Sequence, residues 1–257
     1  MTAYYNEFDP YAAQWLRNLI EAGHIAPGIV DERSIEDVTP NDLRGFTQCH
    51  FFAGIGAWSL ALRNAGWPDE RPVWTGSCPC QPFSAAGAGA GFADPRHLWP
   101  SFAWLIRQCR PAVVFGEQVA SKAVEPWVDL VHANLEALGY AFGVVPFPSA
   151  GVGAPHIRDR LFWVADSDGR GRKVEILHDR NCSTESLVGE ASRSGMRGDA
   201  LWRSPEWVRG VDNKCRPVEP GTFPVAHEIT SRVGRLRAYG NAINAEAARE
   251  FIAAYLA

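Results

Sequence analysis

The chain has 257 residues and a mass of 28.2 kDa, enough for one substantial core and a small appended lobe. Hydrophobic residues make up 46% and charged residues 21%, as in ordinary water-soluble proteins, and no stretch approaches the length of a membrane span. The formal net charge of −4 excludes a globally basic protein, so any surface for nucleic acid must be local.

The cysteines and the amino terminus indicate a reducing compartment. Six cysteines are spread along the chain without the dense spacing of a secreted disulfide framework. The first residues combine neither a basic start nor an apolar run, so they do not resemble a signal peptide. We therefore expect a cytoplasmic protein without contact to a membrane.

Residues 1–49 predict one helix and little else. Asp9-Pro10 is a favourable helix start, and Gly23 ends the apolar periodicity that follows it. Residues 24–48 mix turn-forming and acidic residues. We expect residues 1–49 to form an N-terminal extension packed on a larger domain.

Strands alternate with helices from residue 50 to residue 165, which predicts a mostly parallel, Rossmann-like sheet flanked by helices. Apolar strands are expected near 49–52, 72–74, 111–119, 139–145 and 161–165, and a last helix near 245–256. The first strand runs into Gly54-Ile55-Gly56 and then a helix, a geometry that lets backbone amides face a nucleotide-like ligand. Glycines after strands are also common simply because turns need them.

A rigid loop around Cys80 follows the second of these strands. Gly76 and two prolines keep Thr75–Ser84 from becoming helical, and the next residues, 85–91, are all alanine or glycine. A thiol on a stiff turn beside a mobile lid suits a covalent catalyst, although a lone intracellular cysteine is more often buried and inert. A zinc site that joins Cys78 and Cys80 to Cys182, Cys215 or a histidine is a weaker alternative, because no second close pair is present, and we expect no metal.

Three charged residues accompany this loop. Glu117 ends an apolar strand, at the edge where functional groups collect in parallel sheets. Arg158 and Arg160 are two residues apart, so in a strand their side chains share a face, where surface ion pairing is the ordinary explanation.

Beyond Asp166 the apolar periodicity fades. Aromatic and basic residues alternate around Trp202-Arg203 and Trp207–Arg209, which predicts a small loop-rich lobe over 166–232 with local affinity for nucleic acid. A solvated insertion without a ligand is the competing interpretation, because acidic residues are scattered through the same segment.

Six segments, in this order, resemble the motifs of the cytosine-C5 DNA methyltransferase family, in a compact form of the phage or prophage kind. They are Phe51–Gly56, Pro79-Cys80-Gln81, Phe83-Ser84 through Asp94-Pro95-Arg96, Gly116–Val119, Pro155–Arg160 and Gly240–Ile243. The resemblance covers residues 50–165 and 232–257. It implies a catalytic domain of residues 50–165 plus 233–257, with 166–232 as the target-recognition lobe.

The resemblance also implies the chemistry. Cys80 would add to C6 of a cytosine swung out of duplex DNA, Glu117 would act as general acid at N3, and Arg158 or Arg160 would hold O2. The residues that would bind S-adenosylmethionine are Phe52, Ala53, Gly54, Ile55, Gly56, Asn241 and Ala242. The residues that would contact DNA are Gln81, Ser84, Arg96, Arg203 and Arg209. A monomer in a bacterial or phage-infected cell is expected.

The sequence departs from the family between the glycine turn and Cys80. The family places two further strands there, which carry acids for the ribose and the adenine of the cofactor, but here only Trp67–Arg71 separates the first helix from the next strand. We therefore expect a sheet truncated at one edge. This shortening keeps two alternatives open: a cytosine-modifying enzyme that uses the same adduct without S-adenosylmethionine (deamination, or another one-carbon donor), and a catalytically silent DNA-binding protein.

Overall fold

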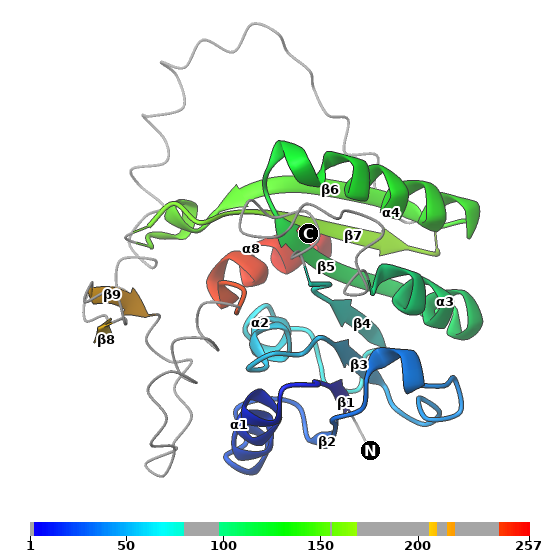
Figure 1. Ribbon diagram of the computed structural model, residues 1–257, viewed down its shortest axis with the longest axis horizontal. Helices are drawn as coiled ribbons and strands as arrows, with labels where there is room; N and C mark the ends of the chain where they lie inside the picture. The colour runs from blue at the N-terminus through cyan, green and yellow to red at the C-terminus, as the bar shows by residue number, and fades with distance from the viewer. Residues whose placement is uncertain (1–2, 80–97, 155, 169–205, 210–214, 219–241) are drawn as a thin grey trace, which may run out of the picture.

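The computed structural model describes residues 3–79, 98–154, 156–168, 206–209, 215–218 and 242–257. Its centre is a seven-stranded sheet in the order β2-β1-β3-β4-β5-β7-β6 (Figure 1). The strands are β1 (Ala3–Asn6), β2 (Gly28–Asp31), β3 (Gln48–Phe51), β4 (Val73–Gly76), β5 (Val113–Val119), β6 (Ala141–Pro148) and β7 (Asp159–Asp166). β7 runs antiparallel to both its neighbours, and the other pairings are parallel, so the predicted mostly parallel α/β fold is confirmed.

Helices cover both faces of the sheet (Figure 1). One face carries α1 (Pro10–Glu21), α2 (Ala57–Asn64) and α8 (Ala245–Leu256), and the other carries α3 (Trp99–Cys109) and α4 (Glu125–Ala137). Short 3-10 turns are η1 (Ile35–Asp37), η4 (Lys122–Val124) and η5 (Ser149–Val152), and β8 (Glu206–Arg209) pairs with β9 (Cys215–Val218) in a separate antiparallel ribbon. Among the described residues, no helix combines the length and the apolar character that crossing a membrane requires.

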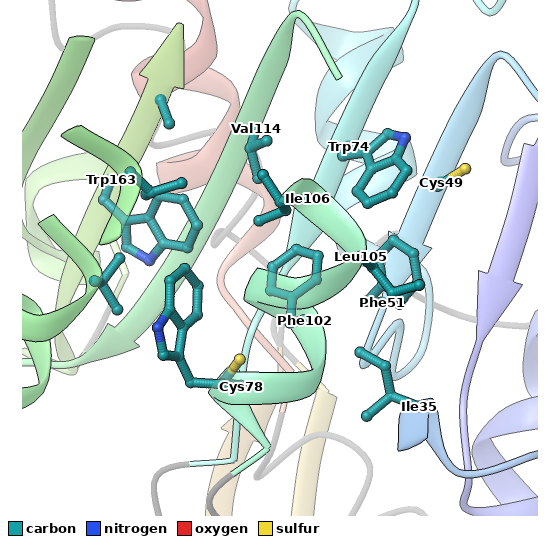
Figure 2. Packing of buried hydrophobic residues seen from close by; sticks show 14 of the residues in the cluster. Ile35, Cys49, Phe51, Trp74, Cys78, Phe102, Leu105, Ile106, Val114 and Trp163 are labelled. Carbon is teal, nitrogen blue, oxygen red and sulfur yellow. The ribbon is translucent and has the colours of Figure 1, made fainter. Parts of the chain in front are cut away.

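The face under α3 is packed largely with aromatic rings (Figure 2). Phe51 lies 5.0 Å from both Trp74 and Phe102 between ring centroids. Glycines in β4 and β5 make room for two of the rings on this face. A Cβ on Gly76 would come within 2.4 Å of Phe102, and one on Gly116 within 2.0 Å of the Trp163 ring. Glycine at these two positions is therefore a packing requirement, and it lies just before the residues that form the candidate site.

The amino-terminal residues are part of the sheet. β1 pairs in parallel with β3 on one side and with β2 on the other, and α1 connects β1 to β2 as a crossover helix. Asp9 caps α1, because its carboxylate accepts hydrogen bonds from the backbone amides of Tyr11 and Ala12. The predicted truncation of the sheet was therefore wrong: the strands missing after α2 are replaced at the same edge by strands that precede β3 in the chain.

Buried polar contacts fix this unit to the rest of the domain. The Tyr5 hydroxyl donates to the carbonyl oxygen of Ala26 and lies 3.0 Å from the hydroxyl of Ser59 on α2. Arg63, in the last turn of α2, forms an ion pair with Asp69 and also donates to the carbonyl oxygen of Gly23 at the end of α1. Such shared contacts are those of a single core, not of an appended segment.

Candidate active site

The glycine turn after β3 is shaped by left-handed backbone. Phe52, Gly54 and Gly56 have φ values of 52°, 56° and 79°. A Cβ on Gly54 would meet nothing within 4 Å, so the backbone there faces open space, whereas a Cβ on Gly56 would press on Leu16 and Ile25 at 3.1 Å. A bulky residue at positive φ, such as Phe52, is uncommon and concentrates at functional sites. The turn therefore offers exposed backbone on top of a packed support.

The end of β1 lies directly against this turn. The amide of Ala53 donates to the carbonyl oxygen of Asn6, and the amide of Gly54 donates to the Glu7 carboxylate at 2.7 Å. Phe8 follows with 72% of its surface exposed. Sequence reasoning missed Glu7 and Phe8, although an acid directly after a Tyr-Tyr strand and before a helix cap is the signal of a strand–loop–helix unit.

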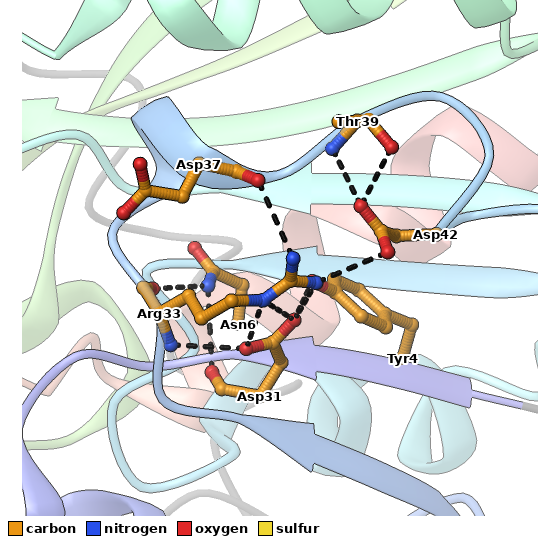
Figure 3. Close-up of polar contacts among 7 residues, drawn as sticks. All are labelled: Tyr4, Asn6, Asp31, Arg33, Asp37, Thr39 and Asp42. Carbon is orange, nitrogen blue, oxygen red and sulfur yellow. Dashed lines mark hydrogen bonds and ion pairs between the residues drawn. The ribbon is translucent and has the colours of Figure 1, made fainter.

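A second acid, Asp31, ends β2 but is already saturated (Figure 3). Its carboxylate accepts hydrogen bonds from the Arg33 guanidinium and, at 2.6 Å, from the Tyr4 hydroxyl. Asp42 adds a second ion pair to Arg33 at 3.2 Å. Despite the desolvation that opposes it, these donors lower the pKa of Asp31 to about 2. This cluster fixes the loop that follows β2, and its acid is not available to a ligand.

Glu117 lies buried in β5, two residues before the strand ends, with 8% of its surface exposed. Burial raises the pKa of its carboxyl group, while the charges of Arg160 and Arg158 and hydrogen bonds from Ser77 and Arg160 oppose that rise. The Arg160 guanidinium on β7 is 2.6 Å from Oε1 of Glu117. A carboxyl group desolvated and paired in this way is poised to exchange a proton, as a general acid must.

The two arginines do different things. Arg158 precedes β7 and has a φ of 39°, so the strand alternation that would place it on the face of Arg160 does not extend to it. Its guanidinium donates to the carbonyl oxygen of Ala242, a residue predicted to bind the cofactor. The structure thus brings Glu117, Arg160 and Arg158 together and connects them to the segment before α8.

Of the two cysteines in the loop after β4, the structure describes one. Cys78 is buried in the core under α3, and burial raises the pKa of its thiol, so it is an inert packing residue (Figure 2). Cys80 lies outside the described residues, as do Gln81, Ser84, Arg96, Arg203 and Asn241. Arg209 is described in its backbone alone, at the end of β8. Within the described part of the chain, no three His, Cys, Asp or Glu side chains gather as a metal site would need.

His50, on β3 just before the glycine turn, has a packing role. Its ring stacks on Tyr5 at 4.8 Å, and its nitrogens lie 2.9 Å from the Thr75 hydroxyl and 3.3 Å from the Gln48 side-chain oxygen. Burial lowers its pKa to about 3, so it is neutral in the folded chain. His50 therefore joins β1, β3 and β4 and has no free nitrogen for a ligand.

Comparison with known proteins identifies the family. The family model described as C-5 cytosine-specific DNA methylase matches residues 67–195, half of the chain. The chain belongs to this family.

The relatives are longer proteins. The chain is 33% identical over 95 residues to the type II methyltransferase M.AplI of Arthrospira platensis, covering 36% of this chain and 28% of that one. It is 25% identical over 167 residues to M.HhaI of Haemophilus parahaemolyticus, covering 50% and 51%. The chain thus spans about half or less of the length of these relatives. A crystal structure of a Spodoptera frugiperda DNMT2 mutant aligns with a TM-score of 0.43 at 16% identity, over 66% of this chain and 44% of that one.

Proposed function

We propose that this C-5 cytosine-specific DNA methylase family member transfers a methyl group from S-adenosylmethionine to C5 of a cytosine in duplex DNA. The observation that carries the proposal is the buried pair of Glu117 and Arg160, 2.6 Å apart, near the end of β5. β5 is the direct neighbour of β4, which leads into Pro79-Cys80-Gln81. The matching family model, described as C-5 cytosine-specific DNA methylase, supports DNA as the substrate.

The chain's own residues would perform the reaction in three steps. The Cys80 thiolate adds to C6 of the cytosine, and the electron pair of the C5–C6 bond becomes available at C5. Glu117 donates a proton or a strong hydrogen bond to N3, which makes C6 electrophilic, and Arg160 holds the acid in place. After C5 has gained the methyl group, loss of the C5 proton to solvent drives elimination of Cys80 and restores the ring.

The residues around the glycine turn fit S-adenosylmethionine. This group supplies an electrophilic methyl on a sulfonium sulfur. Gly54 presents open backbone, and Glu7, directly after β1, accepts the amides of Gly54 and Asp9 and would accept further hydrogen bonds from ribose hydroxyls. Phe8 and Phe52 are the aromatic side chains nearest in the chain to these two residues and would cover an adenine. Residues 3–31 add two strands at the edge of the sheet next to β3, and we propose that they form the cofactor side of the site.

DNA contacts by Gln81, Ser84, Arg96, Arg203 and Arg209, and recognition by the lobe of residues 166–232, remain part of the proposal. The cytosine must leave the base stack to reach a buried acid such as Glu117. The alternative without S-adenosylmethionine rested on a truncated sheet, which is not observed.

The test is to incubate duplex DNA with purified protein, with and without S-adenosylmethionine, and to weigh the released nucleosides. The expected product is 5-methylcytosine, formed only when the cofactor is present. Uracil, or a new base without the cofactor, would favour the deaminase alternative. No product and no covalent adduct on DNA containing 5-fluorocytosine would favour the silent DNA-binding protein.

The two neighbouring cysteines provide a matched control. Cys80→Ala should abolish both the product and the adduct, because it removes the nucleophile. Cys78→Ala should retain both, because this thiol is buried among apolar side chains and its pKa is raised. Loss of the adduct in the Cys78 variant alone would show that the nucleophile has been misassigned.

A further inference from the structure

A hydroxyl group next to the catalytic acid has no assigned role. Gly76, the last residue of β4, pairs with Gly116 of β5, so Ser77, which follows β4 directly, comes level with Glu117. Residues level with each other on parallel strands project from the same face. Ser77 thus lies on the side of Glu117, and its hydroxyl is among the groups that act on the carboxyl group as hydrogen-bond donors.

The other partner of this hydroxyl defines the direction of that bond. Trp58, on α2, donates its indole N–H to the Ser77 oxygen at 3.0 Å. An indole nitrogen can only donate, so the Ser77 oxygen is an acceptor in that contact and its single hydrogen is left for Glu117. Trp58 is itself held firmly, because its ring stacks on Phe115 at 6.1 Å and meets Phe162 edge-on at 6.0 Å.

We infer that Ser77 is a positioning residue for Glu117: held by Trp58, it donates to the carboxylate and sets how readily this acid takes up a proton. The inference rests on the proposed function of Glu117 as general acid. It connects the two halves of the site, because Trp58 lies two residues after Gly56 in the glycine turn. Through the Ser77 hydroxyl, the position of α2 therefore affects the protonation of Glu117.

The balance of charges around Glu117 explains why such a donor matters. Among the described residues, the charges that act on the carboxyl group are those of Arg160 on β7 and Arg158 just before it, and both favour its ionised form. β4 and α2 add the Ser77 hydroxyl and the Trp58 indole, which carry no charge. A hydrogen bond to the charged form stabilises that form, so removing Ser77 should make Glu117 easier to protonate.

Direct titration of Glu117 tests the inference without cofactor or DNA. The protein is labelled with ¹³C at the glutamate side-chain carboxyl, the signal of Glu117 is assigned by its loss in Glu117→Gln, and its chemical shift is followed against pH. Ser77→Ala should raise the midpoint by about one pH unit, the size expected for a lost hydrogen bond to a charged group. Ser77→Thr, which keeps the hydroxyl, should restore the original midpoint.

Two further variants test the role of Trp58 and replace Ser77→Ala if that variant does not fold. Trp58→Phe removes the donor that orients Ser77, so it should shift the midpoint in the same direction by a smaller amount. If Ser77→Ala does not fold, Ser77→Cys keeps the volume with a weak donor and should show the same rise. An unchanged midpoint in the folded Ser77 variant overturns the inference, whether or not the protein methylates DNA. If methylation is observed, the alkaline limit of its pH profile should move upward in Ser77→Ala by the same amount.

Discussion

Leu16 tests whether residues 3–31 are an integral part of the domain. Its side chain is fully buried on α1, and it supports the glycine turn from below together with Ile25. Leu16→Ala removes three carbon atoms, worth about 2.4 kcal/mol of lost burial at ~0.8 kcal/mol per carbon, and the cavity that remains brings the total to about 3–5 kcal/mol.

The free energy of unfolding measured in urea checks this magnitude, and a thermal melt should show a midpoint lower by about 6–15 °C. Glu21→Ala, at the exposed end of the same helix, is the matched control and should change stability by less than about 0.5 kcal/mol. If the two variants unfolded alike, α1 would not be packed into the core, and the assignment of β1 and β2 to the cofactor side of the sheet would fail with it.

Three other variants test the sheet and the site. The pKa of His50 is about 3 when folded, against roughly 6.5 when unfolded, so the unfolded chain binds the extra proton between these values. Stability should therefore rise with pH from about 3 to about 6.5, by up to roughly 1.4 kcal/mol per pH unit, and His50→Gln should flatten this slope in urea titrations. Gly116→Ala places a Cβ 2.0 Å from the Trp163 ring and should cost about 1–3 kcal/mol, measured in the same way. Arg160→Ala leaves Glu117 buried without its ion-pair partner and should cost about 3–5 kcal/mol at neutral pH, most of which the double variant with Glu117→Gln should recover.

The sequence predicted the elements from β3 to β7 because each of them carries its own local signal. Apolar runs such as Val113–Val119 are buried on both faces, and the helices between them repeat apolar residues at helical spacing. The position of Glu117 followed from the same pattern, because a polar residue after a buried strand lies at the functional edge of a parallel sheet. Its contact with Arg160 did not follow, since it depends on the antiparallel register of β7 against β5.

The two amino-terminal strands were not predicted, for a physical reason. β2 is only partly buried because it lies at the edge of the sheet, so it has no fully apolar run. β1 is buried, but it has four residues and lacks the glycine turn that marks the equally short β3. Strand pairing also acts between neighbours in space, so the order of strands along the chain does not fix their order in the sheet. The prediction that Arg158 and Arg160 share a face of one strand was wrong for another reason: the positive φ of Arg158 breaks the two-residue alternation just before β7 begins.

Because β2 is the edge strand and β1 lies between it and β3, the connection from β2 to β3 has to cross β1. A chain that builds the edge strand β2 before the interior strand β3 must return across β1, and residues 32–47 make that return. They do so on the face opposite α1, where Ile35, Val38 and Leu43 enter the core under α3. The return begins at Asp31, and the ion pairs of Arg33 with Asp31 and Asp42 hold it against the strand ends (Figure 3). The acid that ends β2 is thus committed to closing the fold, whereas Glu7, directly after β1, accepts the amide of Gly54 and so lies against the glycine turn.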